Sequence, residues 1–235
     1  MSILSCCFFL SMILLAGCDQ SSTPSSGMSA SGAPPENSVE SGDPTTLVGS
    51  DRPRIVAFGD SLTAGLGVAT ADSYPTQLQR RLDEEGFRYR VINAGVSGDT
   101  TAGGLRRVNW VLSSEPSIVV LELGGNDGLR GLRLEETRSN LEEIIRRLQD
   151  RKVTIVLAGM KLPPNYGADY TTRFESLYGE LAGRYRVALI PFFLEGVAAR
   201  PTLNQADGIH PTAQGYRVVT GNVFSTLVPL LKKAS

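Results

Sequence analysis

Cysteine and histidine are scarce in this 235-residue sequence, and their scarcity limits the chemistry open to it. The three cysteines are Cys6, Cys7 and Cys18, so the rest of the chain has no thiol for a disulfide, a zinc site or a nucleophile. His210 is the only histidine. A mechanism that needs an imidazole must therefore use His210, and we expect neither a metal nor another cofactor.

An excess of charge of one sign is also lacking. The chain has 23 Lys and Arg against 24 Asp and Glu, and without a basic block we expect no nucleic-acid partner. The first lysine is Lys152, which excludes a P-loop. The glycines of residues 65–70 fail the dinucleotide-binding fingerprint at its third glycine. Thr63 occupies the position where the usual α/β-hydrolase elbow has glycine.

The N-terminus predicts export. Residues 1–17 read as a signal peptide, because their apolar run "ILSCCFFLSMILLAG" is too short to span a membrane comfortably. The run leads into Leu15-Ala16-Gly17-Cys18, which resembles a bacterial lipobox and implies that Cys18 is lipidated. Asp19 resembles the signal that retains lipoproteins at the inner membrane of Gram-negative bacteria. We therefore expect a lipid-anchored protein that faces the periplasm, with an uncleaved anchor as the alternative.

After the predicted signal peptide, the sequence predicts a flexible tether and one domain. Residues 18–50 are rich in Ser, Pro, Gly and Thr and have no apolar period, which indicates a flexible linker with a reach of roughly 30 Å. Residues 51–235 are long enough for one domain with its own core. We expect this domain to be monomeric.

Short β-branched runs alternate with helical periods along this domain. The expected strands, which we predict to be buried on both faces, are 54–58, 89–94, 117–123, 153–158 and 187–190. The expected helices are 74–85, 100–113, 135–150, 170–185 and 212–231. The order predicts an α/β fold: a flavodoxin-like three-layer α/β/α sandwich with a central five-stranded parallel sheet. Trp110 and the apolar stripe of 135–150 are expected in the core.

Four segments at the predicted strand ends carry groups suited to acyl transfer. They are "GDSL" (59–62), "NAGVSGDT" (93–100), "GGND" (124–127) and "DGIHPTAQGY" (207–216). Ser61 is a weak nucleophile that needs a base, and only His210 can serve. Asp207, three residues before His210, is a candidate for the carboxylate that orients it, and Asp127 is the alternative. Ligands of such sheets bind beyond these strand ends.

These blocks, together with "ELGGNDGLRG" and "LPPNYG", resemble the SGNH or GDSL hydrolases, and especially their bacterial acyl thioesterase, lysophospholipase and arylesterase branch. The resemblance covers nearly all of residues 52–235. It implies a serine esterase that acts on acyl esters without a metal, with Ser61, His210 and Asp207 as the triad. Ser61, Gly95 and Asn126 would form the oxyanion hole.

Several alternatives remain open from the sequence alone. A carbohydrate O-deacetylase of the same superfamily is one, and a non-catalytic surface binding module on this fold is another. Asp60 and Asp99 are expected as local caps and hydrogen-bond acceptors. Glu122 lies in an apolar strand and must be paired or near solvent. Residues 162–170 either line an acyl groove or form a packed loop.

Overall fold

The computed structural model of the protein describes residues 52–232. The expected signal peptide, the lipidation site Cys18 and the tether lie outside the described residues. Within residues 52–232, no helix is long and apolar enough to cross a membrane.

The expected five-stranded parallel sheet is confirmed, with the strand order β2-β1-β3-β4-β5. Its strands are β1 (Arg54–Gly59), β2 (Arg90–Gly95), β3 (Pro116–Glu122), β4 (Thr154–Ala158) and β5 (Ala188–Ile190). The three central strands are buried along most of their length. The edge strands β2 and β5 are only partly buried, so the expectation of burial on both faces holds for the centre of the sheet alone.

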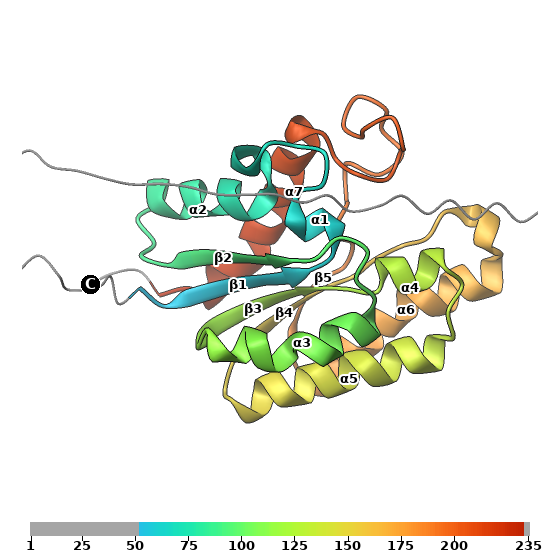
Figure 1. Cartoon of the computed structure of the whole chain (residues 1–235), viewed down its shortest axis with the longest axis horizontal. Coiled ribbons are helices and arrows are strands. Elements are labelled where there is room, and N and C mark those ends of the chain that lie inside the picture. The colour runs from blue at the N-terminus through green and yellow to red at the C-terminus, as the bar shows by residue number, and fades with distance from the viewer. Residues whose placement is uncertain (1–51, 233–235) are drawn as a thin grey trace, which may run out of the picture. The chain divides into compact units, whose positions relative to one another are not determined.

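Five long helices cover the two faces of the sheet and complete the α/β/α sandwich (Figure 1). On one face, α2 (Tyr74–Glu84) lies beside α7 (Ala213–Leu227). On the other face lie α3 (Thr101–Ser113), α5 (Leu134–Asp150) and α6 (Ala168–Tyr185). The last helix is shorter than expected and gives way to the 3₁₀ turn η4 (Val228–Leu230). Pro229 cannot donate the next helical hydrogen bond, which accounts for this early end.

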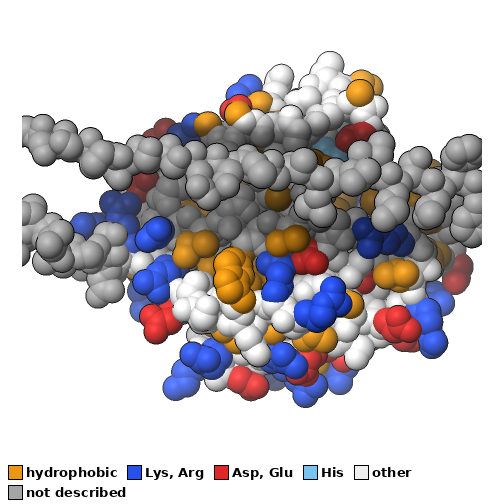
Figure 2. Space-filling view, in the orientation of Figure 1, with side chains coloured by type: hydrophobic (Ala, Val, Ile, Leu, Met, Phe, Trp, Pro, Cys, Tyr) orange, Lys and Arg blue, Asp and Glu red, His pale blue; other side chains and the backbone are white. Residues whose placement is uncertain are grey.

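The predicted core is right for α5 and wrong for one residue of α3. Leu141, Ile144, Ile145 and Leu148 of α5 are completely buried. Trp110, expected in the core, is 59% exposed. It lies about 200° around α3 from the buried Val108, and therefore on the outer side of that helix. On the face shown in Figure 2, basic, acidic and hydrophobic side chains are interspersed.

Short helical segments escaped the sequence analysis. The two that matter for the site are α1 (Ser61–Ala64) and α4 (Gly125–Leu129), which directly follow β1 and β3. The others are the 3₁₀ turns η2 (Thr70–Asp72) and η3 (Pro164–Tyr166). Segments of three to five residues are too short to show a helical period in a sequence.

Candidate active site

The register of the sheet brings the expected site residues to one edge. Gly59 at the end of β1 pairs with Gly95 on one side and with Glu122 on the other. The carboxyl ends of the three strands therefore lie level, and the segments that follow them meet. Gly95 has no room for a side chain, since a Cβ there would overlap the backbone of Ala64 in α1. This close approach places α1 against the end of β2.

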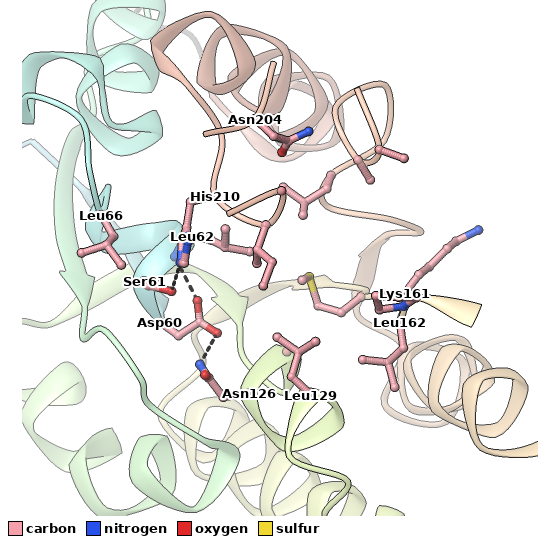
Figure 3. A pocket seen from close by; sticks show the side chains of 18 of the residues that line it. Asp60, Ser61, Leu62, Leu66, Asn126, Leu129, Lys161, Leu162, Asn204 and His210 are labelled. Carbon is pink, nitrogen blue, oxygen red and sulfur yellow. Dashed lines mark hydrogen bonds between the residues drawn. The ribbon is translucent and has the colours of Figure 1, made fainter. Parts of the chain in front are cut away.

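Ser61 is the first residue of α1. The Asp60 side chain caps this helix, with Oδ1 accepting a hydrogen bond from Leu62 N at 3.0 Å, as expected for a local cap. The Ser61 side chain points toward His210, and 2.9 Å separate Ser61 Oγ from His210 Nε2 (Figure 3). Ser61 is thus held at a strand end with its hydroxyl beside the only imidazole.

Asp207 is the carboxylate that contacts His210. Its Oδ2 lies 2.7 Å from His210 Nδ1. Its Oδ1 accepts hydrogen bonds from the backbone N–H groups of His210 and Ile209, at 3.0 and 2.9 Å. These backbone hydrogen bonds, followed by the imidazole, lower the pKa of Asp207 to about 2. Asp127, the open alternative, instead accepts hydrogen bonds from the backbone and hydroxyl of Thr101.

Gln205, which the sequence analysis did not single out, fixes the loop that carries His210. Its backbone N–H donates to the carbonyl of His210 at 2.8 Å. Its side-chain Nε2 donates to the carbonyls of Leu66 and Pro211, at 2.8 and 3.0 Å. Gln205 therefore ties the loop of His210 to the segment that follows α1. No local pattern marks such a residue, because its acceptor on Leu66 is 139 positions away in the chain.

Two of the three candidate oxyanion donors, Asn126 and Gly95, already have hydrogen-bond partners in this structure. Asn126 Nδ2 donates to Asp60 Oδ2 at 3.0 Å and to the carbonyl of Asp99 at 2.9 Å. Gly95 N donates to Asn93 Oδ1 at 2.9 Å. Ser61, as the first residue of α1, has a backbone N–H without an acceptor inside that helix. An oxyanion would add to these bonds or replace some of them.

Arg107 on α3 joins the strand ends beneath the site and was also missed. It forms an ion pair with Asp99 at 2.6 Å. It also donates to the carbonyls of Ala94 and Gly59, each at 2.8 Å, and lies over the Phe58 ring. Asp99 is therefore a hydrogen-bond acceptor, as expected, in an ion pair, but it does not cap the helix. Thr100 caps α3 instead, because its hydroxyl accepts from Gly103 N at 3.3 Å.

A cleft of about 660 Å³ opens beside Ser61 and His210. Its apolar lining includes Leu66, Leu129, Met160, Leu162, Pro163, Pro164, Phe192 and Leu194. Figure 3 shows this cleft with several of its lining side chains. The two readings of residues 162–170 are each right in part. Residues 162–164 line the cleft, whereas the hydroxyls of Tyr166 and Tyr170 donate to backbone carbonyls at 2.9 and 2.7 Å.

Two carboxyl groups lie buried next to Ser61. Asp60 and Glu122 are 2% and 0% exposed. Burial raises the pKa of Asp60 to about 6 and the pKa of Glu122 well above its ordinary value. Glu122 Oε2 accepts from Thr63 Oγ1 at 2.8 Å and from Asp60 N at 3.3 Å. Glu122 is thus paired, which the sequence left as one of two possibilities.

An α/β sandwich that aligns a serine, an imidazole and a carboxylate beside an apolar cleft is typical of hydrolases that cleave acyl esters. Comparison with known proteins assigns the family. Residues 57–218 match the GDSL-like Lipase/Acylhydrolase family, and the chain belongs to it.

Similar proteins cover most of the described domain. Esterase TesA from Pseudomonas aeruginosa is 45% identical over 75% of this chain and 89% of its own length. An arylesterase from Vibrio mimicus is 38% identical over 74% and 88%. Thioesterase 1/protease 1/lysophospholipase L1 from Escherichia coli is 35% identical over 77% and 86%.

Solved structures agree with these relatives. The crystal structure of TesA has a TM-score of 0.74 at 45% identity and covers 76% of this chain and 99% of that one. AlinE4, an SGNH-hydrolase family esterase, has a TM-score of 0.65 at 48% identity, with coverages of 77% and 98%. The protein is therefore a carboxylic ester hydrolase, and the alternative of a non-catalytic binding module is set aside.

Proposed function

We propose that the protein hydrolyses acyl esters, and thioesters in vitro, through a Ser61–His210–Asp207 triad and an acyl-enzyme. The observation that carries this proposal is the continuous chain of contacts from Ser61 Oγ to His210 Nε2, at 2.9 Å, and from His210 Nδ1 to Asp207 Oδ2, at 2.7 Å. Both distances are those expected of a nucleophile, its base and the group that orients the base.

In the first half of the reaction, Ser61 Oγ attacks the acyl carbonyl carbon while His210 Nε2 takes the hydroxyl proton. The Asp207 carboxylate holds the Nδ1–H tautomer and stabilises the imidazolium. The tetrahedral oxyanion accepts hydrogen bonds from the Ser61 and Gly95 N–H groups and from Asn126 Nδ2. Because Asn126 and Gly95 already donate elsewhere, the oxyanion must share or replace some of these bonds.

In the second half, the tetrahedral intermediate expels the alcohol or thiol, which leaves with the proton held by His210. A water molecule then attacks the acyl-enzyme carbonyl, and His210 takes one of its protons. Collapse of the second intermediate releases the carboxylic acid, and the proton on His210 returns to Ser61 Oγ. Every proton is accounted for by His210, the single imidazole of the chain.

The lining of the cleft favours substrates with an apolar acyl group. Leucine, methionine, phenylalanine and proline side chains dominate its wall, and burial of an acyl chain there gains about 0.8 kcal/mol per CH₂. A relative named thioesterase/lysophospholipase and one named arylesterase support the same range of substrates. We therefore propose lysophospholipids, aryl esters and short-to-medium acyl esters, with carbohydrate O-acetyl groups as the second candidate.

The nucleophile is tested with a fluorophosphonate probe. We expect labelling at Ser61 alone, read by mass spectrometry, because only this serine has a base within reach. The control is Ser61→Ala, which should be neither labelled nor active. Labelling that persists in Ser61→Ala would refute the assignment.

The substrate class is tested by comparing kcat/KM for p-nitrophenyl esters of increasing chain length, lysophosphatidylcholine and acetylated xylan. We expect kcat/KM to rise from acetyl to medium-chain esters. A preference for acetylated xylan would favour the deacetylase.

We also propose that the protein is exported and anchored at the membrane through lipidated Cys18, which would bring it close to lysophospholipids. The support is the lipobox-like Leu15-Ala16-Gly17-Cys18 and the linker that follows it. Metabolic labelling with a fatty acid should mark the wild type and not Cys18→Ala. Wild-type protein found unlabelled and free in the periplasm would contradict the anchor and leave the proposed chemistry untouched.

A further inference from the structure

The proposed reaction gives no role to the two buried carboxyl groups that lie next to the nucleophile. Asp60 directly precedes Ser61, and Glu122 is the last residue of the central strand β3. Full burial of a carboxylate costs several kcal/mol unless it is paired or neutral. Two such groups in contact therefore need an explanation in the chemistry of the site.

The contacts form one continuous path from Thr63 to Asn126. Thr63 Oγ1 donates to Glu122 Oε2 at 2.8 Å, and the same oxygen accepts from the backbone N–H of Asp60 at 3.3 Å. Asp60 Oδ2 then accepts from Asn126 Nδ2 at 3.0 Å. The path starts in the helix of the nucleophile and ends at the amide proposed to bind the oxyanion.

Two buried carboxyl groups that lie side by side are costly to ionise together, so one of them carries a proton. The remaining contacts indicate which one. Both oxygens of Asp60 accept N–H donors, from Leu62 N at 3.0 Å and from Asn126 Nδ2 at 3.0 Å. Glu122 Oε1 has no partner within the described region and is fully enclosed. The proton therefore belongs on Glu122 and the negative charge on Asp60.

We propose that Glu122 is a neutral carboxylic acid beside an ionised Asp60, and that Asp60 orients the Asn126 amide for oxyanion binding. This inference rests on the proposed role of Asn126. Asn126 Nδ2 donates to two acceptors, Asp60 Oδ2 and the Asp99 carbonyl, and these two bonds fix the orientation of the amide group. Asp60 is thus a positioning residue, since it acts through Asn126 and does not need to touch the substrate.

The groups around Asp60 support this charge distribution. Glu122 of β3 and His210, before α7, are its ionisable neighbours, and a protonated His210 favours the ionised form of Asp60. Three buried phenols also face this cluster: Tyr74 of α2, Tyr178 of α6 and Tyr216 of α7. Burial raises the pKa of each phenol, so these side chains stay neutral at any pH at which the enzyme works.

The two carboxyl groups are distinguished by replacing each with its isosteric amide. Glu122→Gln should keep kcat within about threefold of wild type, because the amide is neutral like the protonated acid and its oxygen can still accept from Thr63 Oγ1 and Asp60 N. Asp60→Asn should lower kcat by about 10–100-fold with little change in KM, because it puts an amide N–H opposite Asn126 Nδ2. Equal losses in both variants would overturn the proposal, because Glu122 would then have to be ionised.

A double-mutant cycle tests whether Asp60 acts through Asn126. Asn126→Ala alone should lower kcat by about 100–1,000-fold. If Asp60 only orients this amide, Asp60→Asn should cost little more in the Asn126→Ala background. If the fold-losses in kcat of the two single variants multiply in the double variant, the proposal is contradicted. If Asn126→Ala alone has no effect, the proposed oxyanion role fails instead, so the two failures can be told apart.

A spectroscopic measurement remains decisive even if Asp60→Asn does not fold. Infrared difference spectra of wild type against Glu122→Gln at neutral pH should show the C=O stretch of one protonated buried carboxyl group in the wild type only. Ser61→Ala, which leaves both carboxyl groups in place, is the matched control and should keep the band. Absence of the band from the wild type would show that Glu122 is ionised and would overturn the proposal.

Discussion

At the scale of single residues, backbone donors fix the orientation of the half-exposed Asp207 carboxylate and lower its pKa. Two backbone N–H groups hold its Oδ1 and leave Oδ2 for His210. These contacts are local, because the Asp-x-x-His spacing folds the loop back on itself. The lowered pKa, about 2, keeps Asp207 ionised at any pH where an ester hydrolase is assayed. Its titration should therefore not contribute to the pH dependence of hydrolysis.

Asp207→Asn removes the negative charge of the side chain and keeps its shape, so it tests whether His210 needs the charge. The amide oxygen can still accept from Ile209 and His210 N, whereas the amide nitrogen would face His210 Nδ1 and favour the wrong imidazole tautomer. We expect kcat to fall by about 1,000–10,000-fold with KM nearly unchanged. Steady-state kinetics on a p-nitrophenyl ester measure this loss. Asp127→Asn changes a carboxylate that contacts Thr101 and not His210, and a larger loss there would contradict the assignment.

At the scale of secondary-structure elements, the site depends on how the ends of β1 and β2 are joined. Arg107 of α3 binds the carbonyl of Gly59 in β1, the carbonyl of Ala94 in β2 and the carboxylate of Asp99. The side chains of Arg107 and Asp99 are only 17% and 13% exposed, so solvent screens this ion pair weakly. Since the carbonyl of Asp99 accepts from Asn126, Arg107 also supports the amide that we propose as an oxyanion donor.

Arg107→Ala should lower the free energy of unfolding by about 3 kcal/mol, because it leaves a mostly buried carboxylate and two carbonyls without their donor. Urea unfolding followed by circular dichroism measures the change. The control is Arg106→Ala, whose side chain is exposed on the same helix and which should change stability by less than about 0.5 kcal/mol. Equal effects of the two substitutions would mean that the three contacts of Arg107 contribute no net stability.

At the scale of the whole molecule, the buried carboxyl pair should make stability depend on pH. Burial raises the pKa of Asp60 from 3.8 to about 6, and the pKa of Glu122 rises well above 4.5. The folded state therefore binds these protons more tightly than the unfolded state. Their stabilising contribution is complete below the unfolded pKa values and is lost as the pH rises through the folded ones. Asp207 has the opposite sign, but it is exposed and its contribution is correspondingly small.

Glu122→Gln should reveal this dependence. The variant cannot ionise at position 122 and no longer places a second carboxyl group beside Asp60. We therefore expect its free energy of unfolding to rise relative to that of wild type as the pH increases from about 5 to about 9. Urea unfolding at a series of pH values measures the difference. Glu85→Gln, at an exposed position, should show a flat difference, and a flat difference for Glu122→Gln would contradict the raised pKa.

The sequence by itself determined the sheet, the long helices and the candidate catalytic residues. The β-branched runs and the α5 stripe are local periodic signals, so the five strands and the main helices could be located within a few residues. With one imidazole in the chain, His210 had to be the base if the site uses one. Trp110 shows the limit of such reasoning, because an aromatic residue in a helical range does not reveal which side of the helix faces the sheet.

Tertiary structure alone decided how these residues are joined. The choice between Asp127 and Asp207 as the contact of His210 depended on the loop that Gln205 fixes from outside the sequence motif. The roles of Arg107 and Glu122 come from partners between 8 and 62 positions away. The pKa of Glu122 is raised because the side chain is fully buried, and this burial follows from the position of β3 between β1 and β4. Burial and long-range contacts belong to the folded chain, because they exist only after distant segments have met.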